Sequence, residues 1–307
     1  MSYIYTIIIP HKNSPKLLQR CLNSIPRRDD LHIIVVDDNS DPDKVDFECF
    51  PGYDRDDVEI IFTKEGKGAG HARNVGLDHV IDTKWIIFSD ADDFFYETFP
   101  SILDNYKDSN YDVIYFLAKP VDSDTLGPTK RIARANKYIE GYSESDKLSG
   151  AKVKYLYSEP WGKIYNYNLI KKNQIRFQET IICNDVKFSY LTGYYCKSLH
   201  VDKQYLYYVT CRNNSVSQNI TEKATLTRFS VTSEWQKFLN DKKVPITIDY
   251  FDDLLLPLAY DSIHNKKLFR KKIRILKDIH FSDLEILVFV LRGFKYWITR
   301  KIKKSYE

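Results

Sequence analysis

Three short apolar runs near the N-terminus each end in polar or acidic residues, and this pattern constrains the fold more than any other feature. Each run is continuous and rich in β-branched residues, which is typical of a buried parallel strand. In open α/β sheets the ligand binds beyond the carboxyl ends of such strands. The runs cover residues 3–9, 31–36 and 84–89, and they end at Pro10, at Asp37 and Asp38, and at Asp90-Ala91-Asp92-Asp93.

The acidic residues at these strand ends predict a bound cation. Several carboxylates cannot all remain ionised side by side unless a positive charge lies among them. Carboxylate oxygens are ligands that suit Mg²⁺ and Mn²⁺. The sequence therefore predicts a site for one of these ions, together with a phosphorylated ligand, at this edge of the sheet.

Strand and helix patterns alternate along the chain as far as Pro120. Further strand-like runs occupy residues 58–62, 85–88 and 111–118. Apolar residues at helical spacing occupy residues 15–25 and 71–81, and a glycine-rich turn at 66–70 opens the second of these helices. This alternation predicts an α/β fold with a doubly wound, Rossmann-like, mostly parallel sheet that is flanked by helices.

Beyond Pro120 the pattern loosens and then becomes helical. Strand-like segments return at 198–201 and 205–209, and from about Thr221 the spacing predicts helices. We expect a nucleotide-binding half over residues 1–95 and an acceptor-binding, catalytic half over residues 96–220. A helical, basic C-terminal extension is expected over residues 221–307.

Charge is distributed unevenly along the 307 residues. The net charge is +4, but residues 264–307 contain 13 Lys and Arg against 4 Asp and Glu, which leaves a net charge of −5 on the rest. The five cysteines show no CxxC pair and no zinc-like spacing, which fits a reducing cytosol. The short apolar N-terminus lacks a basic lead-in, so we expect a strand and not a signal peptide. No apolar run has the length of a membrane span.

An ordered set of motifs resembles the inverting glycosyltransferases of family 2, which have the GT-A fold. In the first hundred residues these motifs are TIIIP at 6–10 with Asn13, RCLNSI at 20–25, IVVDDNS at 34–40, GHARNVGL at 70–77 and FSDADD at 88–93. Downstream, WGKIY at 161–165, Ile170, FQE at 177–179, Asn184, Asp185 and Phe188 resemble the acceptor half of the family. The resemblance implies transfer of a sugar from a nucleotide-diphosphate donor.

The resemblance assigns Pro10, Asp38, Arg73 and Asp90 to the nucleotide site. Asp38 matches a carboxylate that accepts a hydrogen bond from the ring N–H of the nucleobase, a contact that discriminates between bases. Its alternative is a turn cap. Arg73 matches a donor-site arginine, and a solvated helix residue is its alternative. Lys12 departs from the family, because relatives commonly carry an aromatic residue there.

Asp92 matches the metal-bound aspartate of the family's DxD motif, and the resemblance implies Mn²⁺ or Mg²⁺ as cofactor. A nucleoside diphosphate is a poor leaving group until a cation neutralises the charge that develops on its oxygens. Asp90 is expected to contact the ribose, or the metal through water. Asp93 is expected to cap the next segment, and an acidic solvated loop is the alternative for the whole cluster.

Asp185 matches the catalytic base of the family, which takes the proton of the attacking acceptor hydroxyl. The preceding residue is Asn184, where many relatives have Glu. A helix N-cap is the structural alternative for Asp185. Trp161 and Lys163 resemble a segment near the acceptor, and we expect them to contact it. Packing in the core is the alternative for Trp161.

The basic tail interleaves Lys and Arg with apolar residues, a pattern typical of a helix at an anionic membrane interface. We expect residues 264–307 to contact such a surface, with a solvated helix as the alternative. Nucleic-acid binding is not expected, because the rest of the chain is acidic and no nucleic-acid-binding module is visible. The apolar and aromatic members are 286–291, Phe294, Tyr296 and Trp297, followed by Arg300, Lys301, Lys303 and Lys304.

The sequence thus predicts a metal-dependent, inverting hexosyltransferase that uses a nucleotide-diphosphate sugar, with UDP favoured. The resemblance implies a glycan or lipid-linked glycan acceptor in bacterial surface polysaccharide synthesis, and we expect a cytoplasmic protein that is peripheral on the inner face of the membrane. Without a QxxRW-like motif, a single addition is favoured over processive synthesis.

Other classes of protein fit the motifs less well. A nucleotide-sugar pyrophosphorylase or a dinucleotide dehydrogenase needs a glycine-rich loop directly after the first strand, where this chain has Pro10-His11-Lys12-Asn13. A phosphoacceptor receiver domain fails on topology, because the acidic pair follows the second strand. A non-catalytic nucleotide-sugar or glycan-binding relative is the alternative that the sequence leaves open.

Overall fold

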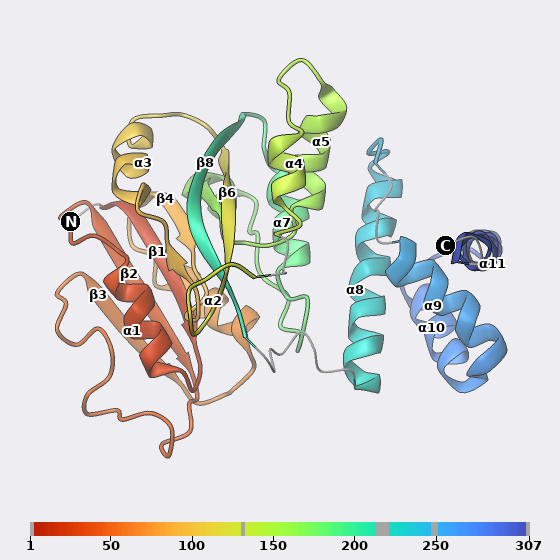
Figure 1. Cartoon of the computed structure of the whole chain (residues 1–307), viewed down its shortest axis with the longest axis horizontal. Helices are drawn as coiled ribbons and strands as arrows, with labels where there is room; N and C mark the ends of the chain where they lie inside the picture. The colour runs from red at the N-terminus through yellow and green to blue at the C-terminus, as the bar shows by residue number, and fades with distance from the viewer. Residues whose placement is uncertain (1–2, 130–132, 213–220, 247–250, 305–307) are drawn as a thin grey trace. The chain divides into compact units, whose positions relative to one another are not determined.

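The structure is a computed structural model that describes residues 3–129, 133–212, 221–246 and 251–304, without the side chains of 251–254, 296–297 and 299–304. The chain forms two compact units, Met1–Val216 and Ser217–Glu307. The first unit is an α/β body, and the second consists of helices (Figure 1). The proposed division of the first unit into donor and acceptor halves at residue 95 stays a prediction.

The described strands of the first unit form one eight-stranded sheet. They are β1 (Tyr3–His11), β2 (Leu31–Asp38), β3 (Val58–Thr63), β4 (Thr83–Phe88), β5 (Phe94–Phe95), β6 (Val113–Asp122), β7 (Lys163–Asn166) and β8 (Leu199–Cys211). Their order is β3-β2-β1-β4-β7-β6-β8-β5. The first four of these run parallel, β7 runs antiparallel to β4 and β6, β8 is parallel to β6, and β5 is antiparallel to β8.

Helices flank this sheet (Figure 1). They are α1 (Pro15–Asn23), α2 (Ala69–Asp78), α3 (Phe99–Tyr106), α4 (Asn136–Glu140), α5 (Lys147–Leu156), α6 (Tyr167–Lys172) and α7 (Val186–Tyr195). The helices predicted at 15–25 and 71–81 correspond to α1 and α2 and are confirmed. α1 ends two residues earlier than predicted, and α2 begins two and ends three residues earlier.

The central strands are buried on both faces, as their continuous apolar sequences predict. β2 is buried along its whole length, and β1 is buried from Tyr5 onward. The register pairs His11 with Asp37 and Ile8 with Phe88, so the carboxyl ends of β1, β2 and β4 lie at one edge of the sheet. Polar groups from three strands therefore meet there.

Two features of the sheet differ from the pattern in the sequence. The segments predicted at 198–201 and 205–209 belong to the single strand β8, whose pairing with β6 passes from Tyr115–Val201 to Leu117–Tyr205. β8 therefore carries a bulge at the polar residues 202–204, which interrupt its apolar sequence. The four-residue strand β7 was not predicted, because it is too short to show a period of its own.

The second unit contains α8 (Glu222–Asp241), α9 (Phe251–His264), α10 (Lys266–Asp278) and α11 (Asp283–Lys304). Its core includes Phe229, Leu255, Leu258, Leu276, Phe281, Ile286 and Phe289. Beside this core the buried ammonium of Lys272 pairs with Asp261 at 2.6 Å. The predicted helical extension is thus confirmed. Among the described residues, no helix has both the length and the apolar character needed to cross a membrane.

The packing of α2 on β1 yields a stability prediction. A Cβ atom added at Gly76 would lie 2.5 Å from Cγ2 of Ile8. Gly76→Ala should therefore lower the free energy of unfolding by about 1–3 kcal/mol, because the added methyl group overpacks the core.

The matched control is Gly150→Ala in α5, where the nearest atoms to an added Cβ lie at 3.8 and 3.9 Å. Helix propensity then dominates, and the free energy of unfolding should rise by up to about 1 kcal/mol. Urea unfolding of the two variants measures the difference, and a loss of equal size in both would contradict the prediction.

Candidate active site

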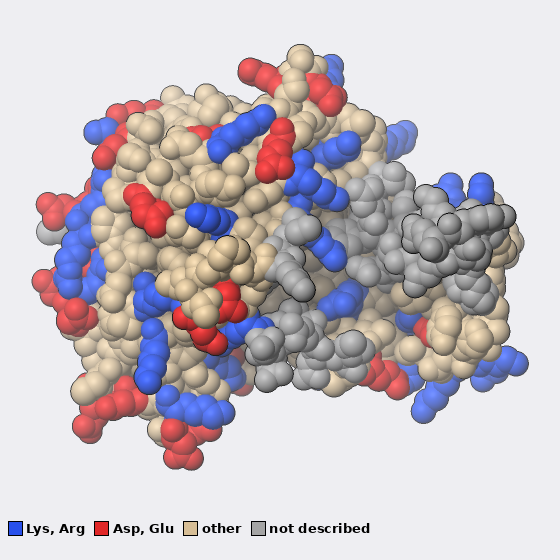
Figure 2. All heavy atoms as spheres, in the orientation of Figure 1, with Lys and Arg blue, Asp and Glu red and all other residues tan. Residues whose placement is uncertain are grey.

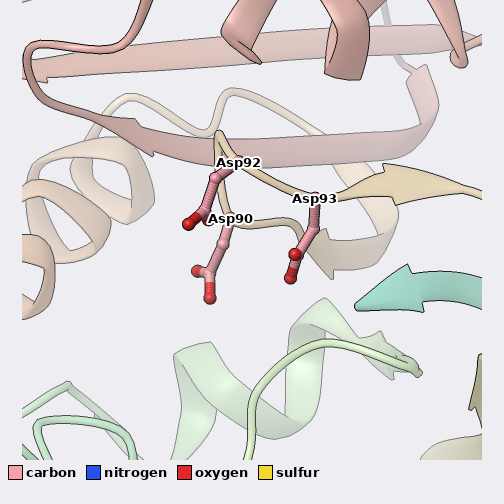
Figure 3. A group of neighbouring side chains, drawn as sticks. All are labelled: Asp90, Asp92 and Asp93. Atoms are coloured by element: carbon pink, nitrogen blue, oxygen red, sulfur yellow. The ribbon is translucent and has the colours of Figure 1, made fainter. Parts of the chain in front are cut away.

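Three aspartates follow β4 on the short loop that leads into β5. Asp90, Asp92 and Asp93 each offer one carboxylate oxygen, and these three oxygens lie within 4.8 Å of one another. Figure 3 shows that the three side chains project to the same side of this loop. Because β4 is buried to its last residue, the loop is the place where this part of the chain can hold charged groups.

Burial and neighbouring negative charge raise the pKa of two of these carboxyl groups, Asp92 and Asp93. Burial raises the pKa of Asp92 and the charge of Asp90 raises it further, while Arg212 opposes the shift. Burial and the charges of Asp92 and Asp90 raise the pKa of Asp93 well above its ordinary value. A divalent cation among these oxygens would remove the repulsion between them.

Contacts from β8 and α1 fix the loop that carries these aspartates. The carbonyl of Asp92 accepts hydrogen bonds from Arg20 Nη2 at 2.7 Å and from Thr210 Oγ1 at 2.9 Å. Arg212 Nη2 lies 2.6 Å from Asp92 Oδ2, and the N–H of Thr210 donates to Asp93 Oδ1 at 2.7 Å. Asp93 is therefore fixed by a backbone hydrogen bond, and Asp92 pairs with the partly exposed guanidinium of Arg212.

The donor set fits a hard divalent cation. All three groups offer oxygen ligands, which Mg²⁺ and Mn²⁺ accept, and the cluster contains no sulfur or imidazole ligand. Asp90 and Asp92 are the residues that would hold the ion, because both are partly exposed whereas Asp93 is buried. This arrangement agrees with the predicted metal residue Asp92 and adds Asp90 as a candidate ligand.

Arg73 of α2 connects the acidic loop to the segment that carries Asp185. Its guanidinium donates through Nη2 to Asp90 Oδ1 and through Nη1 to Asn184 Oδ1, the latter at 2.9 Å. The same group lies 5.2 Å from the ring centre of Phe177. Arg73 is buried, so the alternative of a solvated helix residue does not fit.

Other residues of the GHARNVGL motif hold the same segment against α2. Asn74 Nδ2 donates to the carbonyl of Phe177 at 3.0 Å, and the N–H of Phe177 donates back to Asn74 Oδ1 at 2.9 Å. A Cβ atom at Gly70 would lie 2.1 Å from the carbonyl oxygen of Gln178, so only glycine permits this approach. The motif thus brings Asn184 and Asp185 toward the acidic loop.

Asp185 immediately precedes α7, but its side chain makes no N-cap hydrogen bond. Burial raises the pKa of Asp185 to about 6, Arg73 opposes this shift, and the charges of Glu159 and Asp90 add to it. A carboxyl group with such a pKa is ionised at neutral pH and accepts a proton more readily than an exposed one. The N-cap alternative therefore does not account for this side chain.

Asp37 and Asp38 have different roles at the end of β2. Burial opposes the ionisation of Asp37, but hydrogen bonds from His11 and Ser40 lower the pKa of Asp37 below its ordinary value. His11 Nδ1 donates to Asp37 at 2.7 Å, and its Nε2 accepts the N–H of Ser14 at 3.1 Å. Asp37 is therefore structural, and sequence analysis gave His11 no such role.

Asp38 is buried, and its two carboxylate oxygens differ in their hydrogen bonds. Its Oδ2 accepts the N–H of Gly68 at 2.9 Å and faces Lys12 Nζ at 3.2 Å. Its Oδ1 is also buried and has no hydrogen-bond partner within the described chain. Lys12 thus pairs with the Asp38 carboxylate, at a position where family relatives commonly carry an aromatic residue. Pro10 is buried near the end of β1.

Trp161 and Lys163 lie under the site and not on its surface. The Trp161 ring stacks on Tyr207 at 5.6 Å, and the Tyr207 hydroxyl accepts the N–H of Asp90 at 2.8 Å. Lys163 Nζ donates to the carbonyl of Tyr157 at 2.7 Å, and burial lowers the pKa of Lys163 to about 7. The predicted direct contact of these two residues with an acceptor does not fit this burial, because aromatic packing already occupies both side chains.

Three side chains hold the loop between α5 and β7 by donating hydrogen bonds to its backbone carbonyls. Lys163 binds the carbonyl of Tyr157, Ser189 Oγ donates to that of Ser158, and the Tyr165 hydroxyl donates to that of Pro160 at 3.1 Å. Between these anchors Glu159 lies near enough to Asp185 to raise its pKa. Sequence analysis missed Glu159 and Arg212, because neither belongs to a recognisable motif.

The comparison with protein families decides the class of this chain. A family model described as "Glycosyl transferase family 2" matches residues 6–173, which is more than half of the chain. The chain belongs to glycosyl transferase family 2. The resemblance carried by the motifs is therefore confirmed, and the matched range of the family 2 model ends before Asn184 and Asp185.

Curated relatives match part of this family 2 chain. They include a teichoic acid poly(glycerol phosphate) polymerase of Staphylococcus epidermidis, 36% identical over 92 residues, which are 29% of this chain and 12% of that protein. The succinoglycan biosynthesis protein ExoW of Rhizobium meliloti is 34% identical over 93 residues, 29% of each chain. The chain thus spans less than a third of the length of these two relatives.

Solved structures share the fold of the chain. The crystal structure of S. aureus TarS 1–349 in complex with UDP-GlcNAc aligns with a TM-score of 0.60 and 19% identity over 90% of this chain and 80% of that one. The mannosyltransferase PcManGT from Pyrobaculum calidifontis, in complex with GDP-Man and Mn²⁺, aligns with a TM-score of 0.54 and 14% identity over 100% and 83%. The predicted GT-A type of α/β fold is therefore confirmed.

The environment of Asp185 predicts a stability change that does not depend on any activity. A pKa of about 6 in the folded chain exceeds the ordinary 3.8, so folding disfavours the ionised carboxylate. Stability from this group is present at about pH 4 and is lost as the pH rises through about 6. Asp185→Asn should therefore raise the free energy of unfolding at neutral pH by about 1–3 kcal/mol.

The gain should disappear at about pH 4, where the wild-type carboxyl group is also largely neutral in the fold. Urea unfolding of the wild type and of Asp185→Asn at pH 7 and at about pH 4 measures this difference in the free energy of unfolding. Asp124→Asn, at an exposed turn, is the matched control and should change little. A gain of the same size at both pH values would contradict the assigned pKa shift.

Proposed function

We propose that this family 2 chain is a metal-dependent, inverting glycosyltransferase of the hexosyltransferase class. The observation that carries the proposal is the continuous contact from the acidic loop through Arg73 to Asn184, the neighbour of Asp185. One end offers oxygen ligands for a cation, and the other offers a carboxylate that is suited to proton transfer. An inverting transfer needs both groups, on opposite sides of the reacting sugar carbon.

The side chains divide the work of this reaction. Asp185 takes the proton of the acceptor hydroxyl as its oxygen attacks the anomeric carbon, and the bond to the diphosphate oxygen breaks on the other side. Asp90 and Asp92 hold Mn²⁺ or Mg²⁺, which when bound stabilises negative charge on the diphosphate. Arg73 and Arg212 carry guanidinium groups that pair well with phosphate oxygens.

The donor is a nucleotide-diphosphate sugar, with UDP favoured as carrier. Asp38 accepts the ring N–H of the nucleobase through its buried Oδ1, which has no partner in the described chain. Uracil, guanine and thymine each offer such an N–H, so the shape of the pocket around Pro10 and Lys12 selects among them. The complexes of TarS with UDP-GlcNAc and of PcManGT with GDP-Man support a nucleotide sugar as the ligand class.

The acceptor is a glycan or a lipid-linked glycan in bacterial surface polysaccharide synthesis. Two curated relatives, a teichoic acid polymerase and a succinoglycan biosynthesis protein, support this class. We place the reaction in the cytoplasm at the inner face of the membrane, with residues 264–307 in contact with the anionic lipid surface. The excess of basic residues in that range supports this contact.

Calorimetry of nucleotide binding tests the donor site. In the presence of Mn²⁺, UDP should bind more tightly than GDP or dTDP. Asp38→Ala should weaken UDP binding by about tenfold to a hundredfold, the factor that a hydrogen bond to a charged group contributes.

Asp43→Ala, on the exposed loop after β2, is the matched control and should leave UDP binding unchanged. Equal affinity for all three nucleotides, unaffected by the loss of Asp38, would overturn the nucleobase contact.

Turnover of the donor tests the two carboxylate roles separately. Asp185→Asn should lower kcat by about 10²- to 10⁴-fold and keep nucleotide binding, because a general base acts in the chemical step. Asp92→Asn should lower both Mn²⁺-dependent nucleotide binding and turnover.

The wild-type rate should rise with pH through about 6, as Asp185 becomes ionised. Glu159→Gln should move this rise to lower pH, because it removes a neighbouring negative charge. Full turnover in the presence of EDTA would contradict the proposed role of the metal. Donor binding without hydrolysis or transfer to any acceptor would instead indicate a non-catalytic relative.

A further inference from the structure

Helix α11 presents an exposed apolar face that no part of the described chain covers. The exposed fractions are 71% for Leu284, 53% for Leu287, 57% for Leu291 and 55% for Ile298. These residues follow one another at intervals of three, four and seven, which places them on one side of the helix. Single exposed leucines are ordinary, but a continuous stripe of large apolar side chains marks a contact surface.

The opposite side of α11 is fixed in the core of the second unit. Ile286 and Phe289 are buried there among residues of α8, α9 and α10. Gly293 packs closely on α9, since an added Cβ atom would lie 2.3 Å from the carbonyl oxygen of Leu255. The helix therefore cannot rotate to bury its leucines without breaking this core.

Both acidic and basic residues flank the stripe in sequence, since Asp283 and Glu285 adjoin Leu284 and Arg292 adjoins Leu291, and further basic residues lie on α10. Arg292 and Lys295 are exposed on α11 itself. On α10, Lys266, Arg270 and Arg274 lie four residues apart on one exposed side, and none of the three forms an ion pair with a described residue. In the view of Figure 2, basic side chains project from the second unit. Lys266, Arg270 and Arg274 thus add exposed positive charge to the apolar side chains of α11.

We propose that α11 docks on an anionic lipid bilayer, with Leu284, Leu287, Leu291 and Ile298 inserted at the level of the headgroups and upper acyl chains. The basic residues of α10 and α11 then face lipid phosphates, and each adds electrostatic attraction within a Debye length of the surface. A helix with an apolar stripe and basic flanks binds in the plane of such an interface. This inference deepens the membrane contact in the proposed function by naming the residues that enter the lipid.

Charge favours a bilayer over a second copy of the chain as the occupant. Contact between two copies through α11 would bring together two segments with the same excess of positive charge, because residues 264–307 contain 13 Lys and Arg against 4 Asp and Glu. Like charges in a contact are unfavourable. An anionic lipid surface supplies the opposite charge and the apolar layer at once.

Sedimentation of the full chain with vesicles tests the proposal without any donor or acceptor. The protein should pellet with vesicles of phosphatidylcholine and phosphatidylglycerol, and it should remain in solution with phosphatidylcholine alone. The double variant Leu287→Gln, Leu291→Gln should bind the mixed vesicles at least about tenfold more weakly, because two apolar side chains leave the lipid. Equal pelleting of the variant and the wild type would overturn the insertion face.

Matched variants separate docking from folding and from charge. Ile81→Gln alters an equally exposed apolar residue of the first unit and should leave pelleting unchanged. The triple variant Lys266→Gln, Arg270→Gln, Arg274→Gln should weaken binding to mixed vesicles, and added salt should do the same to the wild type.

Two further outcomes would also overturn the proposal. The first is equal binding to both vesicle types. The second is that light scattering finds the wild type to be a dimer and the double leucine variant to be a monomer, while neither protein pellets with vesicles. In that case the leucine face binds a second copy of the chain. UDP calorimetry on the double variant should match the wild type. Failure to bind lipid with normal UDP binding would therefore reject docking and leave the proposed transferase activity standing.

Discussion

The buried guanidinium of Arg73 is the contact on which the arrangement of the candidate site depends. It binds Asp90 from the loop after β4 and Asn184 from the segment before α7, so one side chain joins two regions that are distant in sequence. The second partner of Arg73 is the neutral amide of Asn184, so Arg73 is paired with one carboxylate. A Glu at position 184, as in many relatives, would give it a second one. The same guanidinium lies near enough to Asp185 to oppose the rise in the pKa of that carboxyl group.

Environment gives similar carboxyl groups different chemistry in this protein. Asp37 accepts hydrogen bonds from His11 and Ser40, which lower its pKa despite burial. Asp185 is enclosed without comparable donors, and its pKa rises to about 6. Asp92 and Asp93 stand beside other carboxylates, which raises their proton affinity. These separate environments are what allow one group to hold a turn, another to exchange a proton and others to face a cation.

Residues at strand ends could be predicted from the sequence, whereas residues that act through distant contacts could not. Continuous apolar runs predicted β1, β2 and β4, and hence the edge where Asp38 and Asp90 lie. β7 is too short for any periodicity, so its place between β4 and β6 is visible only in the folded chain. Lys163 was expected to contact the acceptor because its segment resembles one near the acceptor in the family, but a tyrosine ring and a backbone carbonyl enclose its ammonium. Such a cage has no signature in local sequence.

The loop at residues 157–160 has a consequence for how this protein can diversify. Its path is set by hydrogen bonds to the backbone carbonyls of Tyr157, Ser158 and Pro160, and a backbone carbonyl is present whatever side chain the residue carries. Glu159 can therefore be exchanged without moving the main chain beside Asp185. New side chains can therefore replace Glu159 by mutation at little risk to folding, and each would change the charge or polarity beside Asp185 while the loop keeps its path.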